Sequence, residues 1–214
     1  MTDAPSERVR VRRLANRAIY GRDEQYAILD AAPLAHVGVS TDDGPVVLPM
    51  AFGRRGDTLY LHGSAANQLL RTGADAEVCV TVTHLDGLVL ARSVFHHSMN
   101  YRSVVVRGAA RRVEDPEEKL AGLRCITDHV VARWDDSRLP DDAEMRQTLV
   151  LAVPLDEAPA KVRTGDPVDD DEDRAGPWWA GVVPFALRPE PPMDAADLAA
   201  GIDVPGAVRG LTGT

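Results

Sequence analysis

Apolar positions along this chain fall into short alternating or continuous runs, which turn residues separate. Such runs are typical of β-strands, and they predict strands at residues 36–40, 46–52, 58–62, 77–83, 88–91, 104–113 and 148–155. The connectors at 41–44 and 54–57 contain Asp-Gly and Gly-Asp pairs, which favour tight hairpins. Pro49 lies inside the second run and cannot donate a ladder hydrogen bond. This strand must therefore lie on a sheet edge, at a bulge or beside an open surface.

Three segments have the spacing and the end signals of helices, at residues 22–32, 64–73 and 116–133. Ser64 and Asp115 are the candidate N-cap residues of the second and third helices. The third helix also has a proline at its first position and apolar residues along one face, so it should pack against the strands. Hairpin-connected strands with helices beside them predict a mainly β fold with flanking helices, built as a small antiparallel barrel.

The composition is that of a globular protein, with 44% apolar and 27% charged residues among 214. The formal net charge of −9 opposes a general attraction to nucleic acid or to an anionic membrane. The apolar runs are far shorter than the ~20 residues of a membrane span, and the N-terminus has no apolar signal core. We therefore expect a cytoplasmic protein with no nucleic-acid or membrane partner.

Three parts are expected along the chain: a basic arm at 1–13, a barrel domain at 14–188 and a tail rich in proline and alanine at 189–214. No metal site is expected. Cys79 and Cys125 each lie in apolar patterns, which favours buried thiols. The acidic run at 169–173 lacks the ligand spacing and the glycine of a calcium-binding loop, so we expect it to be solvated.

Two polar segments are candidates for a binding site. Residues 93–103 carry hydroxyl, imidazole, amide and guanidinium groups between two apolar runs, which is more than a simple hairpin turn needs. Both a binding edge and a long solvated loop remain open for them. At residues 62–64 a strand gives way to a helix start, where free N–H groups suit a phosphate, although most such helix starts cap themselves.

Four segments in order resemble a known family: Gly-Pro-Val-Val-Leu-Pro-Met-Ala-Phe52, Leu-Tyr-Leu-His-Gly-Ser64, Val-Cys-Val-Thr-Val-Thr83 and Ser-Met-Asn-Tyr-Arg-Ser-Val-Val-Val-Arg-Gly108. Together they resemble the FMN-binding split-barrel proteins, within the pyridoxamine 5′-phosphate oxidase-like and nitroimidazole-resistance branch. The resemblance spans about residues 10–185. Residues 161–165 and 178–184 also look like the end of that family's domain.

This resemblance implies an antiparallel split β-barrel and a homodimer that binds FMN in clefts between its subunits. Residues 48–51 would run beside the flavin ring, and residues 62–64 would hold the ribityl phosphate. Trp178 or Trp179 would close over the cofactor from the partner chain. The implied cofactor-binding residues are Leu48, Pro49, Met50, Ala51, His62, Gly63, Ser64, Gln68, Thr81, Tyr101, Arg102, Ser103, Lys161, Arg163 and Trp179. We expect the end of the third strand and the rim beyond Phe95 to face a neighbouring copy.

The chain departs from the family pattern at the phosphate. The vitamin-forming oxidases have an Arg-Lys pair where this chain has Asn67-Gln68. Charge-assisted hydrogen bonds are about twice as strong as neutral ones, so Arg71, Arg92 or Arg102 must take over, or the cofactor is held weakly. Lys161 and Arg163 are the nearest other cations for this charge. The substrate-gripping segment of the true oxidases is also missing, so pyridoxal phosphate synthesis is not predicted.

The function that these residues and the resemblance imply is an FMN-dependent oxidoreductase that passes electrons from a reduced nicotinamide to a small acceptor. No catalytic acid, base or nucleophile is required, because the cofactor performs the redox step. The alternatives are a flavin carrier without turnover, or a split barrel that holds haem or a deazaflavin. Haem would need a histidine that projects into an apolar pocket, and the sequence identifies none. His36 and His129 lie in strand and helix patterns and are interpreted as structural.

Overall fold

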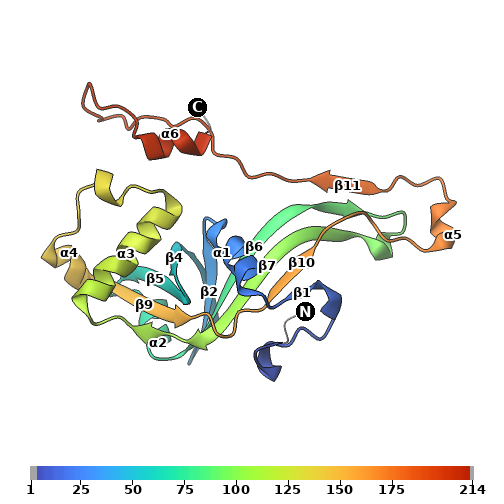
Figure 1. The fold of residues 1–214 in the computed structure, drawn as a ribbon, viewed down its shortest axis with the longest axis horizontal. Helices are drawn as coiled ribbons and strands as arrows, with labels where there is room; N and C mark the ends of the chain where they lie inside the picture. The colour runs from blue at the N-terminus through green and yellow to red at the C-terminus, as the bar shows by residue number, and fades with distance from the viewer. Residues whose placement is uncertain (1–3, 213–214) are drawn as a thin grey trace.

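The computed structural model describes residues 4–212 and contains two antiparallel sheets (Figure 1). The first sheet has the order β1, β10, β7, β6, β2 and β3, with β11 paired to β6, and the second has the order β4, β5, β9 and β8. The strands are β1 Ala18–Ile19, β2 Ala35–Thr41, β3 Gly44–Met50, β4 Phe52–Arg55, β5 Thr58–Ser64, β6 Glu77–Leu90, β7 Ser98–Ala109, β8 Arg111–Arg112, β9 Thr148–Pro154, β10 Ala160–Arg163 and β11 Gly181–Pro184. The prediction of a mainly β, antiparallel split barrel is confirmed.

One apolar core lies between the two sheets. In β2, Ala35, Val37 and Val39 are buried while the intervening side chains are more exposed, as the strand period of two requires. Leu59 and Leu61 of β5, in the other sheet, belong to the same buried cluster. The alternation leaves the remaining side chains of β2 on the outer face of the first sheet.

The helices are α1 Arg22–Asp30, α2 Gln68–Gly73, α3 Pro116–Val130, α4 Asp142–Gln147, α5 Asp171–Arg174 and α6 Gly206–Thr212, with 3₁₀ turns η1 Glu7–Val9, η2 Ala15–Arg17, η3 Val94–His96 and η4 Trp134–Asp136. The side chain of Asp115 caps α3 as predicted, accepting a hydrogen bond from the Glu118 N–H at 2.8 Å. The buried face of α3 packs on the second sheet. Gly53 allows this close approach, because a Cβ there would lie 2.6 Å from the carbonyl carbon of Cys125.

Two strand boundaries differ from the prediction. Residues 46–52 are not one strand, because the chain passes from the first sheet to the second at Ala51, between the end of β3 and the start of β4. Strands β6 and β7 are also longer than predicted, so most of the polar segment 93–103 is strand and not loop. The reason is backbone pairing on both sides of β7, with β6 and with β10, which polar side chains do not prevent.

The second helix starts later than predicted. Asn67, not Ser64, is its N-cap, and the Asn67 side chain accepts a hydrogen bond from the Leu70 N–H at 3.2 Å. The Ser64 hydroxyl instead accepts from the Ala66 N–H at 3.2 Å, which stabilises the turn before the helix. Both residues are favoured caps, so the sequence alone did not distinguish them.

The acidic run is not wholly solvated, and the prediction is wrong for Asp169. This residue is 5% exposed. Its carboxylate accepts hydrogen bonds from the Arg92 backbone N–H at 2.7 Å and from the Arg92 guanidinium at 2.9 Å. The contact holds the segment before α5 against the loop that joins β6 to β7. The other members of the run, Asp170 to Asp173, are partly or fully exposed, as predicted.

The N-terminal arm and the C-terminal segment are placed differently on the barrel. The arm contacts the barrel, because Ser6 and Arg8 bind Glu157, and Arg8 also binds Glu77 at 3.0 Å. After β11, residues 185–212, here called the strap, run back along the molecule to α6 on the side of α3 (Figure 1). The parts of the predicted arm and tail at 1–3 and 213–214 lie outside the described residues. Among residues 4–212, no helix has the length and apolarity to cross a membrane.

Candidate cofactor site

Strand β3 forms an open edge of the first sheet, which is one of the three alternatives that Pro49 left open. It pairs with β2 on one side and has no strand on the other in the described chain. Val47 and Leu48 are 61% and 40% exposed although both are apolar. An exposed apolar strand edge with free backbone groups offers contacts to a planar ligand or to another chain. Residues 48–51, the predicted ring-binding segment, form the end of this edge and the crossing into β4.

Two histidines flank this segment. His36 of β2 lies opposite Pro49 in the strand register. His62 lies at the end of β5, and the pairing of Phe52 with Leu61 places it opposite Ala51. The Nδ1 atom of His62 is buried and has no hydrogen-bond partner among the described residues. Burial lowers the pKa of the His62 imidazole, which favours its neutral form.

The other four histidines each bind a protein group, namely His84 Nε2 to the Ile28 carbonyl at 2.9 Å, His129 Nε2 to the Ala32 carbonyl at 2.7 Å, His97 Nδ1 to the Ala91 N–H at 3.0 Å and His96 Nε2 to Asp170 at 3.3 Å. The structural interpretation of His129 agrees with this contact. That of His36 does not, because its side chain is exposed and makes no hydrogen bond within residues 4–212. His36 and His62 are therefore the free imidazoles of the described chain.

The structure narrows the choice of a phosphate-binding cation. Arg92 is paired with Asp169 at 2.9 Å, and Arg102 is paired with Asp86 at 2.8 and 2.9 Å. Arg71 has no such acid partner within the described residues. It lines an open hollow of about 520 Å³ with Ala66, Gln68 and Thr72, next to the end of β5. Of the three arginines considered from sequence, Arg71 is the one whose charge is available beside Gly63, Ser64 and Gln68.

Lys161 and Arg163 are not brought to this edge within one chain. They lie on β10, and β7, β6 and β2 separate β10 from β3. Lys161 donates to the Arg13 carbonyl at 3.2 Å, and the buried Arg163 donates to the carbonyls of Gly165 and Asp166. Burial, followed by the nearby Arg17 charge, lowers the pKa of Arg163.

The remaining predicted residues lie partly near the β3 edge and partly near β10. Thr81 lies opposite His36 in the register of β6 with β2, two strands in from the β3 edge. Tyr101 and Ser103 lie opposite Arg163 and Lys161 on the far side. Trp179 is 65% exposed, with its indole ring against Gly181.

The rim beyond Phe95 does not meet the end of β5 in one chain. The tip of the β6–β7 hairpin and the β5–α2 junction lie at opposite ends of the long axis (Figure 1). Phe95 is 86% exposed at that tip. A cleft built from both segments therefore requires a second copy of the chain.

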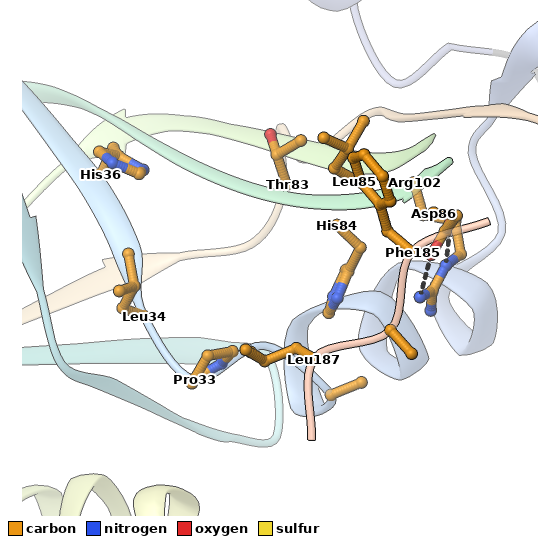
Figure 2. A pocket seen from close by; sticks show the side chains of 12 residues that line it. Pro33, Leu34, His36, Thr83, His84, Leu85, Asp86, Arg102, Phe185 and Leu187 are labelled. Carbon is orange, nitrogen blue, oxygen red and sulfur yellow. Dashed lines mark hydrogen bonds and ion pairs between the residues drawn. The ribbon is translucent and has the colours of Figure 1, made fainter. Parts of the chain in front are cut away.

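A cavity of about 800 Å³ lies on the outer face of the first sheet, and sequence reasoning did not identify it (Figure 2). Its lining residues are Ala31, Pro33, Leu34, His36, Thr83, His84, Leu85, Asp86, Arg102, Phe185, Ala186 and Leu187. His36 and Arg102 lie toward its two ends, and the start of the strap passes across it. The alternation of β2 could have placed His36 on this face, but no pattern indicated that residues 185–187 would cover it.

A family model described as pyridoxamine 5′-phosphate oxidase matches residues 21–162. The chain belongs to this family. The match covers the second sheet and the first sheet apart from β1, β11 and the end of β10, so the resemblance found in the sequence is confirmed. Members of the pyridoxamine 5′-phosphate oxidase family share the fold, and the strap lies beyond the matched residues.

Solved structures of two relatives align over nearly the whole chain. The flavocytochrome Anf3 from Azotobacter vinelandii is 38% identical, with a TM-score of 0.94, and the match covers 98% of this chain and 99% of that one. The FAD and haem binding protein from Mycobacterium smegmatis is also 38% identical, with a TM-score of 0.87, covering 92% and 97%.

A shorter relative matches less of the chain. It is a Bacteroides thetaiotaomicron protein named for 5-nitroimidazole antibiotic resistance, 30% identical with a TM-score of 0.55, and the match covers 68% of this chain and 86% of that one. A search of curated proteins returned no significant match.

Proposed function

We propose that this chain is a redox protein that binds a flavin and a haem, and that it passes electrons from a reduced nicotinamide to a small acceptor. The observation that carries the proposal is the whole-length match to two relatives, one named a flavocytochrome and one named for FAD and haem. The free imidazoles of His36 and His62 on either side of residues 48–51 support it.

The residues after β5 that were expected to hold the cofactor phosphate suit FAD better than FMN, the cofactor expected from sequence. An FMN phosphate is a terminal dianion, and the family's Arg-Lys pair is replaced here by Asn67-Gln68. In this chain the Asn67 side-chain oxygen caps α2, and Arg71 is the one nearby cation that has no acid partner in the described residues. The pyrophosphate of FAD is linked to an adenosine and its negative charge is spread over two phosphates. It therefore needs less positive charge from the protein at any one point than the terminal phosphate of FMN does. The relative from Mycobacterium smegmatis is named for FAD.

Haem fits the donor set of the chain as a non-covalent group. The two cysteines are far apart in sequence and neither lies in a Cys-x-x-Cys-His motif, so the chain has no motif for c-type attachment. A histidine imidazole is a common axial ligand of haem iron. The requirement set from sequence, a histidine facing an apolar pocket, is met by His36 and the cavity on the outer face of the first sheet.

When bound, the two groups supply hydride acceptance and single-electron transfer. The residues of the chain hold and shield them. Residues 48–51 offer backbone groups along the open edge of β3, and Arg71 offers a cation near Gln68. Burial lowers the pKa of His62 and so favours its neutral form, which can donate or accept a hydrogen bond without adding charge. We propose that a second copy of the chain closes the site, bringing its β6–β7 tip or Trp179 to this edge.

Anaerobic stopped-flow mixing of the purified protein with NADH and with NADPH tests the proposed function. We expect the flavin band to bleach and the haem bands to change to those of the reduced form afterwards. Addition of an acceptor should restore both. A flavin that neither nucleotide bleaches, at any concentration, would contradict the enzyme proposal and favour a carrier. Chemically reduced protein is the control that the cofactors are redox-active.

A further inference from the structure

The cavity on the outer face of the first sheet has the size and lining of a site for a large planar molecule. Its volume of about 800 Å³ lies in the upper part of the range of small-molecule and cofactor pockets. Most of its lining is apolar, and its walls come from three separate parts of the chain: the turn before β2, the middle of β6 with its neighbour β7, and the strap.

The strap forms the roof of this cavity and is fixed over it. Pairing of β11 with β6 ends at Pro184 opposite Gly87, and the Phe185 N–H then donates to the Asp86 carbonyl at 3.0 Å. Phe185 and Leu187 remain 45% and 86% exposed although they are held against the opening. Large apolar side chains held this way and left uncovered indicate an occupant that packs against them.

His36 is the one imidazole in the cavity that is free to bind an iron. His84 also lines the cavity, but its Nε2 atom is hydrogen-bonded to the Ile28 carbonyl at 2.9 Å. His36 makes no hydrogen bond within residues 4–212, and its neighbour across the strands is Thr81, a neutral side chain. Figure 2 shows His36 at one end of the cavity, with Leu34 beside it on the same segment.

Arg102, whose charge is paired with that of Asp86, supplies a guanidinium donor toward the other end. Asp86 holds two of its guanidinium nitrogens, Nε at 2.9 Å and Nη2 at 2.8 Å, which fixes the plane of the group. Its Nη1 makes no hydrogen bond to the described residues, so it can donate to a carboxylate. A macrocycle with an iron at its centre and propionates at its edge would match this separation of imidazole and cation.

The comparisons point to the same part of the chain. The family model ends at residue 162, and the nitroimidazole-resistance relative aligns with 68% of this chain. The two relatives named for a cytochrome or for haem align with 98% and 92% of it. The strap, which roofs the cavity, lies outside the segment common to the family.

We propose that this cavity is the haem site, with the His36 imidazole as an axial ligand and Arg102 as the partner of a propionate. This proposal rests on the haem part of the proposed function, and it locates the haem in this cavity. His62, on the other side of residues 48–51, then belongs to the flavin. The cavity itself contains no residue of β3, and its link to that edge is His36, which lies opposite Pro49 in the strand register.

Haem content of histidine variants tests the assignment. His36→Ala and His62→Ala are expressed with added haem precursor, and the ratios of haem and of flavin to protein are measured. His36→Ala should lose haem affinity by more than about 100-fold, since even loss of supporting residues costs 10–100-fold, while its flavin ratio stays at the wild-type value. His62→Ala should keep the wild-type haem ratio and Soret position. Free imidazole added to His36→Ala should restore the wild-type Soret band.

A conservative variant separates ligation from folding. His36→Met retains an iron ligand of another kind, so it should keep haem with a shifted Soret band. Wild-type haem content and spectrum in His36→Ala, or loss of haem in His62→Ala alone, would overturn the assignment and leave the proposed function intact. Wild-type protein that takes up flavin but no haem would instead remove the haem part of the proposed function.

Discussion

His62 is a buried imidazole whose Nδ1 atom has no partner in the part of the chain that the structure describes. Burial lowers its pKa because the charged form loses hydration that no nearby acid replaces. Protonation of His62 should therefore cost the folded state more than the unfolded chain. Consequently, the free energy of unfolding should depend on pH through this residue.

His62→Gln should reduce the pH dependence of stability. In the wild type the unfolded chain binds a proton at His62 near its ordinary pKa of about 6.5, and the folded protein binds it only at lower pH. The stability that His62 provides is thus present above about pH 6.5 and lost as the pH falls. Urea unfolding at neutral and mildly acidic pH measures it. With the cofactor-free protein, the exposed His36→Gln variant is the control, and equal pH dependence in wild type and His62→Gln would contradict the account.

At the scale of elements, α3 approaches β4 at Gly53 more closely than a side chain permits. A Cβ on Gly53 would lie 2.6–2.7 Å from backbone atoms of Cys125 and Ile126, which cannot rotate away. Gly108 in β7 is different, because a Cβ there would meet Pro154 at 3.4 Å, an ordinary contact. Equivalent substitutions at the two strand glycines should therefore have different costs.

Gly53→Ala should lower the free energy of unfolding by about 2–3 kcal/mol, because α3 must move to relieve the overlap. Gly108→Ala should change it by less than about 1 kcal/mol. Chemical denaturation of both variants measures the difference. A Gly53→Ala protein as stable as Gly108→Ala would show that α3 does not pack on β4 at this distance.

The buried carboxylate of Asp169 joins two elements, the segment before α5 and the loop between β6 and β7. Asp169→Asn keeps the shape but loses the charge-assisted contact to Arg92. We expect faster cleavage by trypsin after Arg174 in this variant. Glu172→Gln, at an exposed position in the same run, should leave the cleavage rate unchanged. Equal rates for the two variants would show that the Arg92 contact does not hold this segment.

The sequence predicted most elements and misplaced their ends where tertiary pairing decides. The apolar pattern at 36–40 and the Asp115 cap located β2 and α3, because these signals are local. The crossing at Ala51 is set by two sheets that no local pattern distinguishes. The burial of Asp169 depends on Arg92, which is far away in sequence.

Some of the predicted site residues lie close together in the structure, and others do not. Residues 48–51 and His62 lie close together, because the pairing of β4 with β5 brings His62 opposite Ala51, whereas Thr81 lies two strands in from the β3 edge. Lys161 and Arg163 lie on the same sheet with three strands between them and β3, which no motif spacing could have shown. The cavity with His36 was missed because the strap forms one of its walls, and its residues 185–187 have no periodicity.

At the scale of the whole molecule, apolar side chains are exposed along β3 and at the β6–β7 tip. We expect a homodimer that covers at least the β3 edge. Val47→Asp should shift the protein toward the monomer in size-exclusion chromatography with light scattering. Leu139→Asp, at an exposed apolar position in the loop before α4, should not. Wild-type protein that remains a monomer at all concentrations would contradict this expectation.

The central claim is that one chain holds both a flavin and a haem. Its most direct test is the absorption spectrum of the purified protein, together with the identity and amount of cofactor released by acid. The account predicts flavin bands and a Soret band in the same preparation, FAD as the released flavin, and haem that is extracted without covalent attachment. A preparation that carries flavin and takes up no haem on reconstitution, or one that takes up neither, would contradict it.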